Sequence, residues 1–230
     1  ARGPAGRPQS SLAVPWIGAA VVVCVMVAAG TWYMTSGGTP GRTAVPAASA
    51  TAVTYQTVAG QRAIVTLPNG TRVTLGPATT IRASASAERT RVDLTGKALF
   101  VVHASASNAF EVRTTTAAAR VLGTTFLVEE YPEDSGSTVA VVEGKVEVHA
   151  GAANSPEGGV IITGDQTASV SDSGSIQVLR DSDLAPYTGW TQGTLAFRKT
   201  PVRRIVAELA RVYDIELRVE DSVLAQRTLT

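Results

Sequence analysis

Residues 62–75 read RAIVTLPNGTRVTL and carry the clearest structural signal in the chain. Apolar and polar residues alternate from Arg62 to Leu67 and again from Thr71 to Leu75, which is the period of a strand with one buried face. Pro68-Asn69-Gly70 lies between the two segments. An Asn-Gly pair supplies the positive φ that a tight hairpin turn requires. This stretch therefore predicts a β-hairpin.

The same kind of pattern repeats on both sides of the hairpin. From about Thr54 to Arg180, short apolar segments alternate with turn residues, and segments with a helical period are nearly absent. Turn signals at roughly 8- to 12-residue intervals are typical of a β-sandwich, barrel or solenoid. The predicted fold class is mainly β, with an all-β domain over residues 54–180 that is a sandwich or is β-solenoid-like and has many short strands. Further strands are expected at 90–94, 98–103, 110–114, 119–129, 138–142, 145–149, 160–162, 167–170 and 176–179.

The N-terminal region differs because residues 12–34 carry no charge. Roughly 20 apolar residues cross the ~30 Å hydrocarbon core of a bilayer, and Trp16 and Trp32 lie near the two ends, where interfacial aromatic residues are found. We expect a transmembrane helix over 12–34, a cytoplasmic stub over 1–11 and a flexible linker over 35–53. A cleaved signal peptide is the alternative, because small residues at 27–29 and 48–50 resemble cleavage sites.

Charge predicts the orientation of this span. Arg2 and Arg7 precede it, whereas the next positive residue, Arg42, lies well beyond its end. Positive residues favour the cytoplasmic side of a membrane. We therefore expect a single-pass protein of the inner (cytoplasmic) membrane, with a cytoplasmic N-terminus and periplasmic C-terminal domains.

Composition narrows the chemistry that the chain can perform. Its 20 basic and 19 acidic residues give a net charge of +1, which argues against nucleic-acid binding. With only Cys24, His103 and His149, a thiolate zinc site and a His-rich metal site are excluded. No cofactor or metal is expected, and an enzyme acting on a separate substrate is the weakest hypothesis. Both histidines are interpreted as surface or partner-satisfied residues, with pH sensing as the alternative.

The last segment, residues 187–230, has a mixed pattern. Thr194 to Phe197 alternates as a strand, Thr200 offers an N-cap before Pro201, and Asp214 to Val219 alternates again. Between them, apolar residues recur at the 3.6-residue period of a helix with one buried face; they are Val202, Ile205, Val206, Leu209, Val212 and Tyr213. The pattern predicts a small α/β unit in which a helix connects two parallel strands (βαβ).

The same helix also carries Arg203, Arg204, Glu208 and Arg211. Mixed charges at these spacings are typical of a solvated helical face. Docking on a partner is the alternative interpretation.

Five motifs of the β domain occur in a familiar order. They are VTLPNGTRVTLG at 65–76, VDLTGKALFVV at 92–102, FEVRT at 110–114, ARVLGTTFLV at 119–128 and VAVVEGKVEV at 139–148. Together they resemble the FecR family of bacterial transmembrane sensors and anti-sigma regulators, over roughly residues 54–221. WTQGTLAF at 190–197 and the segment after it are similar to the short N-terminal domain of secretins and TonB-dependent receptors, of which the chain would hold a truncated copy.

The resemblance implies a sensor without substrate turnover. The periplasmic domains would bind the signalling domain of an outer-membrane TonB-dependent transporter, as in the regulation of iron transport, and a cytoplasmic segment absent from this chain would bind a sigma factor. Proteolysis is the expected route of release, because a single span does not easily transmit a large rotation. The alternative is a membrane-anchored envelope β-domain with a structural or ligand-binding role and no sigma factor partner.

Gly123-Thr124 is the candidate reactive site. Some FecR-like regulators are thought to cleave themselves at such a step, and this is what the resemblance implies here. The Thr124 hydroxyl would attack the Gly123 carbonyl, which glycine can hold in a strained geometry, and water would hydrolyse the resulting ester. The alternative is structural: Gly123 is a bulge in a long strand and Thr124 is packed.

Overall fold

The computed structural model describes residues 52–86, 89–105, 109–151, 158–180 and 183–229. These residues form one compact unit that is mainly β, as the alternation pattern predicts. The expected stub, transmembrane helix and most of the linker lie outside the described residues. Within the part that is described, the structure contains no helix that is both long enough and apolar enough to span a membrane.

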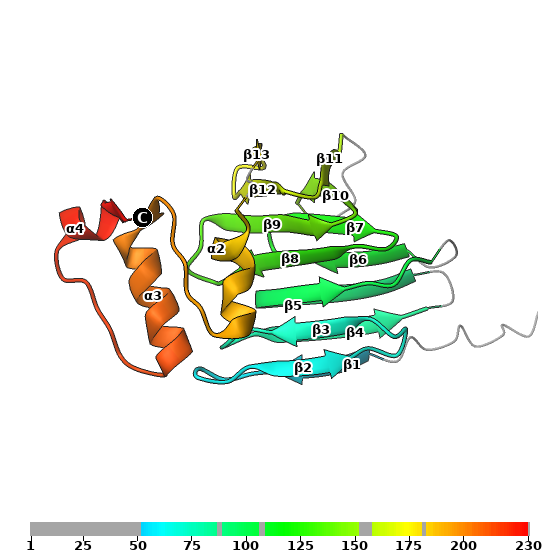
Figure 1. Ribbon diagram of the computed structural model, residues 1–230, viewed down its shortest axis with the longest axis horizontal. Helices are drawn as coiled ribbons and strands as arrows, with labels where there is room; N and C mark the ends of the chain where they lie inside the picture. The colour runs from blue at the N-terminus through cyan, green and yellow to red at the C-terminus, as the bar shows by residue number, and fades with distance from the viewer. Residues whose placement is uncertain (1–51, 87–88, 106–108, 152–157, 181–182, 230) are drawn as a thin grey trace, which may run out of the picture. The chain divides into compact units, whose positions relative to one another are not determined.

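Two sheets share one long strand (Figure 1). The first sheet contains, in spatial order, β1 (Ala52–Gln56), β4 (Thr80–Ala85), β5 (Arg89–Val101), β6 (Ala109–Arg113), β7 (Ala117–Val121), β10 (Lys145–Ala150) and β11 (Val160–Thr163). The second contains β2 (Ala63–Thr66), β3 (Arg72–Leu75), the C-terminal half of β5, β8 (Thr125–Glu130), β9 (Gly136–Glu143), β12 (Gln166–Ser171) and β13 (Ile176–Arg180). Neighbours are antiparallel except β5 and β6, which are parallel.

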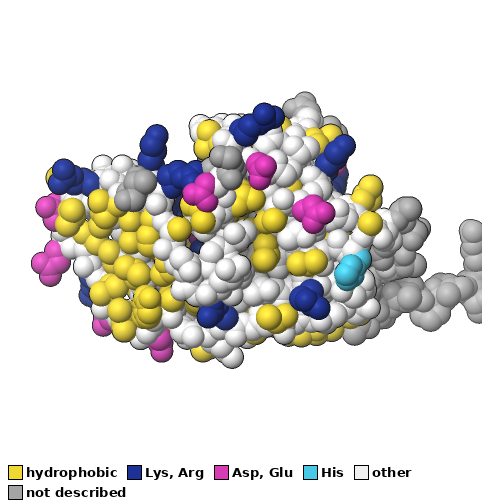
Figure 2. Space-filling model, in the orientation of Figure 1, with side chains coloured by type: hydrophobic (Ala, Val, Ile, Leu, Met, Phe, Trp, Pro, Cys, Tyr) yellow, Lys and Arg dark blue, Asp and Glu magenta, His cyan; other side chains and the backbone are white. Residues whose placement is uncertain are grey.

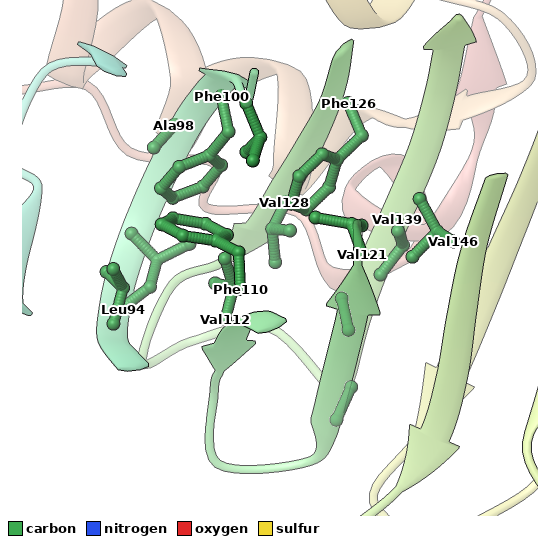
Figure 3. Packing of buried hydrophobic residues seen from close by; sticks show 14 of the residues in the cluster. Leu94, Ala98, Phe100, Phe110, Val112, Val121, Phe126, Val128, Val139 and Val146 are labelled. Atoms are coloured by element: carbon green, nitrogen blue, oxygen red, sulfur yellow. The ribbon is translucent and has the colours of Figure 1, made fainter. Parts of the chain in front are cut away.

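The two sheets enclose a single hydrophobic core, so the fold is a β-sandwich. Alternate residues of each strand point inward, and three rings lie at the centre (Figure 3). The Phe100 ring stacks on Phe126 with centroids 5.3 Å apart and is tilted against Phe110 at 5.8 Å. Burying rings of this size supplies much of the driving force for packing the sheets together.

The predicted hairpin is confirmed. Strands β2 and β3 pair from Ala63 with Leu75 to Thr66 with Arg72. Gly70 has φ +82°, and the Asn69 side chain accepts a hydrogen bond from the Thr71 N–H at 3.1 Å. Gly70 therefore supplies the positive φ that the sequence predicts, whereas Asn69 has no positive φ and contributes through its side chain.

Two predicted strand boundaries are wrong. Segments 90–94 and 98–103 form the single strand β5, which passes from the first sheet to the second and has Gly96 at φ +110°. Segment 119–129 instead divides into β7 and β8, which belong to different sheets. In β5 the inward-facing positions keep the same phase from Leu94 to Phe100, so the period alone does not reveal where the strand changes sheets. Between β7 and β8 the phase shifts by one residue, from Val121 to Phe126, across Gly123-Thr124-Thr125.

The segment after residue 183 packs on the outer face of the second sheet. A short helix α2 (Ala185–Thr188) leads into the 3-10 turn η1 (Gly189–Gln192), and α2 lies across the strands in Figure 1. Trp190 is buried there against Leu127 and Ala140. This contact joins the C-terminal tail, residues 183–229, to the sandwich.

The predicted βαβ unit is wrong in its strands and right in its helix. Helix α3 (Val202–Tyr213) is present, with Pro201 rather than Thr200 at the N-cap position. Residues 194–197 and 214–219 form no strand; instead β14 (Thr200–Pro201) pairs antiparallel with β15 (Thr228–Leu229), after helix α4 (Ser222–Gln226). Short alternating segments without a neighbouring strand cannot pair their backbone groups, so alternation alone does not make them strands.

The predicted apolar face of α3 is only partly covered, since four of its six residues are half-buried: Val202, Val206, Leu209 and Val212. Ile205 is buried, whereas Tyr213 is 62% exposed. The residues that follow add further exposed side chains, namely Ile215, Leu217, Val223, Leu224 and Leu229. Figure 2 shows hydrophobic side chains gathered over the region of α3 and α4. A contiguous apolar surface of this kind is typical of a protein contact.

Candidate functional site

Gly123 and Thr124 lie at a corner of the sandwich, where the chain leaves β7 in the first sheet for β8 in the second. The backbone of Thr124 makes two hydrogen bonds with Val102, of 3.0 and 3.1 Å. Next to this corner the chain returns to the first sheet at Gly144, where an added Cβ would lie 2.9 Å from the Gly123 oxygen. At this corner, the connection from β7 to β8 therefore lies against the connection from β9 to β10, and each of them joins one sheet to the other.

Gly123 is required for space and not for φ. It is absent from the residues with positive φ in the described chain, so the expected backbone strain is not found there. A Cβ at Gly123 would lie 2.5 Å from the Ala104 Cα, closer than any real contact. The structure therefore explains this glycine by close packing of two backbone segments.

The Thr124 side chain is buried and hydrogen-bonded. Its hydroxyl donates to the Lys145 carbonyl at 2.8 Å. For attack on the Gly123 carbonyl, this proton would have to move to a base, and a backbone carbonyl is a very weak one. The geometry favours the structural interpretation, and self-cleavage stays an untested prediction.

Thr124→Ala separates these interpretations. We expect the purified wild-type chain to give one intact mass, and the variant to lower the free energy of unfolding by about 1 kcal/mol, because the partly buried hydrogen bond to the Lys145 carbonyl is lost. Intact mass spectrometry and denaturant titration provide the measurements. Thr125→Ala, at a half-buried neighbour, is the control. Two fragments that break before Thr124, and that vanish in Thr124→Ala but persist in the control, would instead establish self-cleavage.

A second site lies where α3 contacts the sandwich. Arg204, Glu208 and Arg211 form one stripe along the helix, and this stripe faces β5, β8 and the turn after β8. Of the four charged residues interpreted as a solvated face, only Arg203 is exposed. That interpretation is wrong for the other three, because they dock on the chain's own β domain. The helix thus turns its charged stripe inward and leaves part of its apolar face uncovered.

Lys97 and Glu208 form the centre of this contact. The Lys97 Nζ donates to the Glu208 Oε1 at 2.7 Å and lies 3.4 Å from the Glu129 Oε1, and both Lys97 and Glu208 are buried. Burial raises the pKa of Glu208, but the charges and hydrogen bonds of Lys97 and Arg211 outweigh it, so the pKa lies below the usual 4.5. Glu208 therefore stabilises the fold above about pH 4.5, and this contribution is lost as the pH falls through the lowered pKa.

Arg211 completes the contact at the C-terminal end of α3. Its guanidinium lies 3.1 Å from Glu208, pairs with Glu133 and stacks over the Tyr131 ring at 3.6 Å. The Tyr131 hydroxyl donates to the Pro77 carbonyl at 2.9 Å, and burial raises its pKa. The Gly60 N–H donates to the Arg211 carbonyl at 2.7 Å. Planar stacking of this kind is specific to arginine among the cations.

Sequence reasoning missed Lys97, which proved to be the central cation of this contact. The available signal was a lysine at position 97, within an otherwise apolar strand segment; a charge there is buried only when it is paired. The two histidines differ in exposure. His103 is exposed, as expected of a surface residue. His149 is buried, and its Nε2 lies 3.3 Å from the Glu147 carboxylate. In the described residues, no group of three or more candidate ligands could hold a metal ion.

The chain is similar to one protein family and to solved structures of related proteins. The FecR protein family matches residues 53–147, from β1 to β10. A crystal structure of a candidate anti-sigma factor from Parabacteroides distasonis is 32% identical, with a TM-score of 0.65, and the match covers 71% of this chain and 76% of that one. A second such structure from the same organism is 30% identical, with a TM-score of 0.70 and coverage of 77% and 82%. No curated protein sequence matches the chain.

Proposed function

Because the chain belongs to the FecR family, we propose that it is a membrane-anchored sensor that controls a sigma factor in response to a signal from outside the cytoplasm. The observation that carries the proposal is the match of the sandwich to this family, together with two candidate anti-sigma factors of the same fold. The FecR match and these neighbours support a sigma-factor regulatory sensor in general.

The proposed topology follows the sequence. Residues 12–34 would cross the inner membrane with the N-terminus in the cytoplasm, and the sandwich and tail would lie in the periplasm. The signalling domain of an outer-membrane TonB-dependent transporter would contact the periplasmic part. A sigma factor would be held on the cytoplasmic side of this membrane.

The tail is the element that we propose to move. Its helix α3 is held by buried ion pairs, which contribute little net stability because desolvation offsets the attraction. Its apolar face is at the same time partly free. A partner that covers this face would favour a released tail over the docked one, in proportion to its difference in affinity for the two states. Release would expose the domain to proteolysis and so free the sigma factor.

A transcriptional reporter tests this proposal. Cells would carry the complete gene, the neighbouring sigma factor gene and a promoter read by that sigma factor. We expect the signal to change reporter output by about 5- to 150-fold, the range of usual coupling energies. A version without residues 183–229 should lose the response, because the tail is the part that changes state.

Two controls distinguish loss of signal transmission from a general loss of the protein. Arg218→Ala, at a tail residue whose side chain is 82% exposed and pairs with Glu216, should respond as the wild type does. Deletion of the transporter's periplasmic signalling domain should abolish the response without altering protein level. An unchanged response after removal of the tail, at equal protein level, would contradict the proposal.

A further inference from the structure

A cavity of about 500 Å³ lies between the outer face of the second sheet and the tail segment from Pro186 to Pro201. Its size falls within the range of small-molecule sites in proteins, about 300–1,000 Å³. We propose that it binds a small anionic molecule with an aromatic or apolar body. The inference goes beyond the proposed function and does not depend on control of a sigma factor.

The floor and one wall of the cavity have opposite character. Lys97, Glu129, Thr138 and Ser169 lie in one cross-strand row on β5, β8, β9 and β12, as the strand register shows, and form a polar floor. The tail and β13 contribute an apolar wall, formed by Leu179, Tyr187, Trp190, Leu195 and Phe197. A ligand that fills such a site needs both a polar end and an apolar body.

The charge of the lining selects the sign of the polar end. Five cationic side chains line the cavity, against the two carboxylates Glu129 and Glu208; the cations are Lys97, Arg180, Arg198, Lys199 and Arg204. Arg198 also pairs with Asp183 at 2.5 Å, outside the lining. Arg204 likewise pairs with Asp134 at 3.4 Å, also outside the lining. Counting Asp183 and Asp134 with the two lining carboxylates gives four negative charges against five positive ones, which leaves one positive charge in excess. Arginine and lysine around an apolar wall fit a carboxylate, sulfonate or phosphate group on an aromatic body.

Occupancy of the cavity is coupled to docking of the tail. Lys97 and Arg204 belong both to the cavity and to the α3 contact, and the roof of the cavity is the tail itself. A molecule bound between roof and floor contacts only the docked form. By mass action it therefore stabilises that form.

Calorimetric titration of the full chain in a neutral detergent tests the proposal, with protein-free detergent as the blank. The probe is 2-naphthoate, and the matched neutral probe is 2-naphthylmethanol. We expect the anion to bind about 10-fold more tightly or better, because charge-assisted hydrogen bonds add to the same apolar contact. Ser169→Trp, which places a ring in the cavity from an exposed position on β12, should abolish binding. Arg180→Ala should weaken binding of the anion and leave binding of the alcohol unchanged.

Two variants serve as controls. Thr54→Trp, at an exposed position on β1, and Arg218→Ala, at an exposed arginine away from the cavity, should bind 2-naphthoate as the wild type does. Equal affinity for the two probes would overturn the choice of an anion. Unchanged binding of 2-naphthoate by Ser169→Trp would overturn the site, since the probe would then occupy the exposed apolar surface instead.

Discussion

Replacing Lys97 with methionine is expected to destabilise the docked tail by about 3–5 kcal/mol, the usual cost of breaking a buried ion pair from one side. Methionine fits the space but removes the cation 2.7 Å from the buried Glu208, which keeps only its weaker contact with Arg211 at 3.1 Å. The chain can avoid this cost by releasing α3 into water. Amide hydrogen exchange in residues 202–213 should therefore become about 100-fold faster or more, because each 1.4 kcal/mol is a factor of ten.

The controls for this variant distinguish docking from general stability. Lys145→Met, at an exposed lysine on β10, should leave exchange in α3 unchanged. The double variant Lys97→Met with Glu208→Leu removes both charges and should recover much of the loss, because no buried charge is left unpaired. Exchange in the β5 and β8 core should change much less than in α3. A change of less than about threefold in α3 exchange would contradict the assignment of Lys97 as the central cation.

Glu111→Gln is expected to have the largest effect on the sandwich itself, about 3–5 kcal/mol in the free energy of unfolding. Glu111 is 1% exposed on β6 and is surrounded by three arginines: Arg113 contacts it most closely, with Arg120 at 3.0 Å and Arg91 at 3.5 Å. An amide of the same shape cannot neutralise them, so three cations would be left to repel one another. Unfolding with urea measures the loss of stability, because urea is uncharged and does not screen the charges as guanidinium chloride would.

The pH dependence gives this prediction a definite sign. Burial raises the pKa of Glu111, but hydrogen bonds and charges from Arg113 and Arg120 lower it below 4.5. Glu111 therefore stabilises the native state fully above about pH 4.5 and loses this contribution as the pH falls through the lowered pKa. The difference in stability between wild type and Glu111→Gln should be largest near neutral pH and should shrink in acid.

A matched variant checks that the effect belongs to this cluster. Glu147→Gln changes a carboxylate on β10, which is separated from β6 by β7. Its side chain is 44% exposed, and ion pairs at exposed positions contribute only about 0–1 kcal/mol. We expect a loss of at most about 1 kcal/mol for it. Equal losses for the two variants, or a loss for Glu111→Gln that does not depend on pH, would contradict the role given to the arginine cluster.

Much of the fold was predictable because the signals involved are local. Gly70 specifies the turn through the positive φ that glycine tolerates, and Asn69 does so through a side-chain hydrogen bond. Alternation along each strand marks the side that will be buried. Helix α3 was predictable for the same reason, from the period of its apolar residues. The strand predicted at 214–219 failed because it has no neighbouring strand with which to pair.

The candidate sites were harder to predict, because their chemistry depends on partners distant in sequence. Gly123-Thr124 was identified from its motif, yet the close approach of Ala104 and Gly144 that explains the glycine is visible only in the fold. The charged stripe of α3 was identified but placed in solvent, because the sequence does not indicate which surface a helix will meet. The cavity has no sequence signal, since its floor and roof come from five separate segments.

The sequence by itself determined that the chain would be mainly β, where its hairpin would turn and that one amphipathic helix would follow, because each of these depends on neighbours within a few residues. Only the tertiary structure decided how the strands divide between two sheets and which side of α3 is buried. The physical reason is distance along the chain: Lys97 and Glu208 are separated by 111 positions, and the pairing of their charges is possible only after the sandwich has formed the surface on which the helix docks.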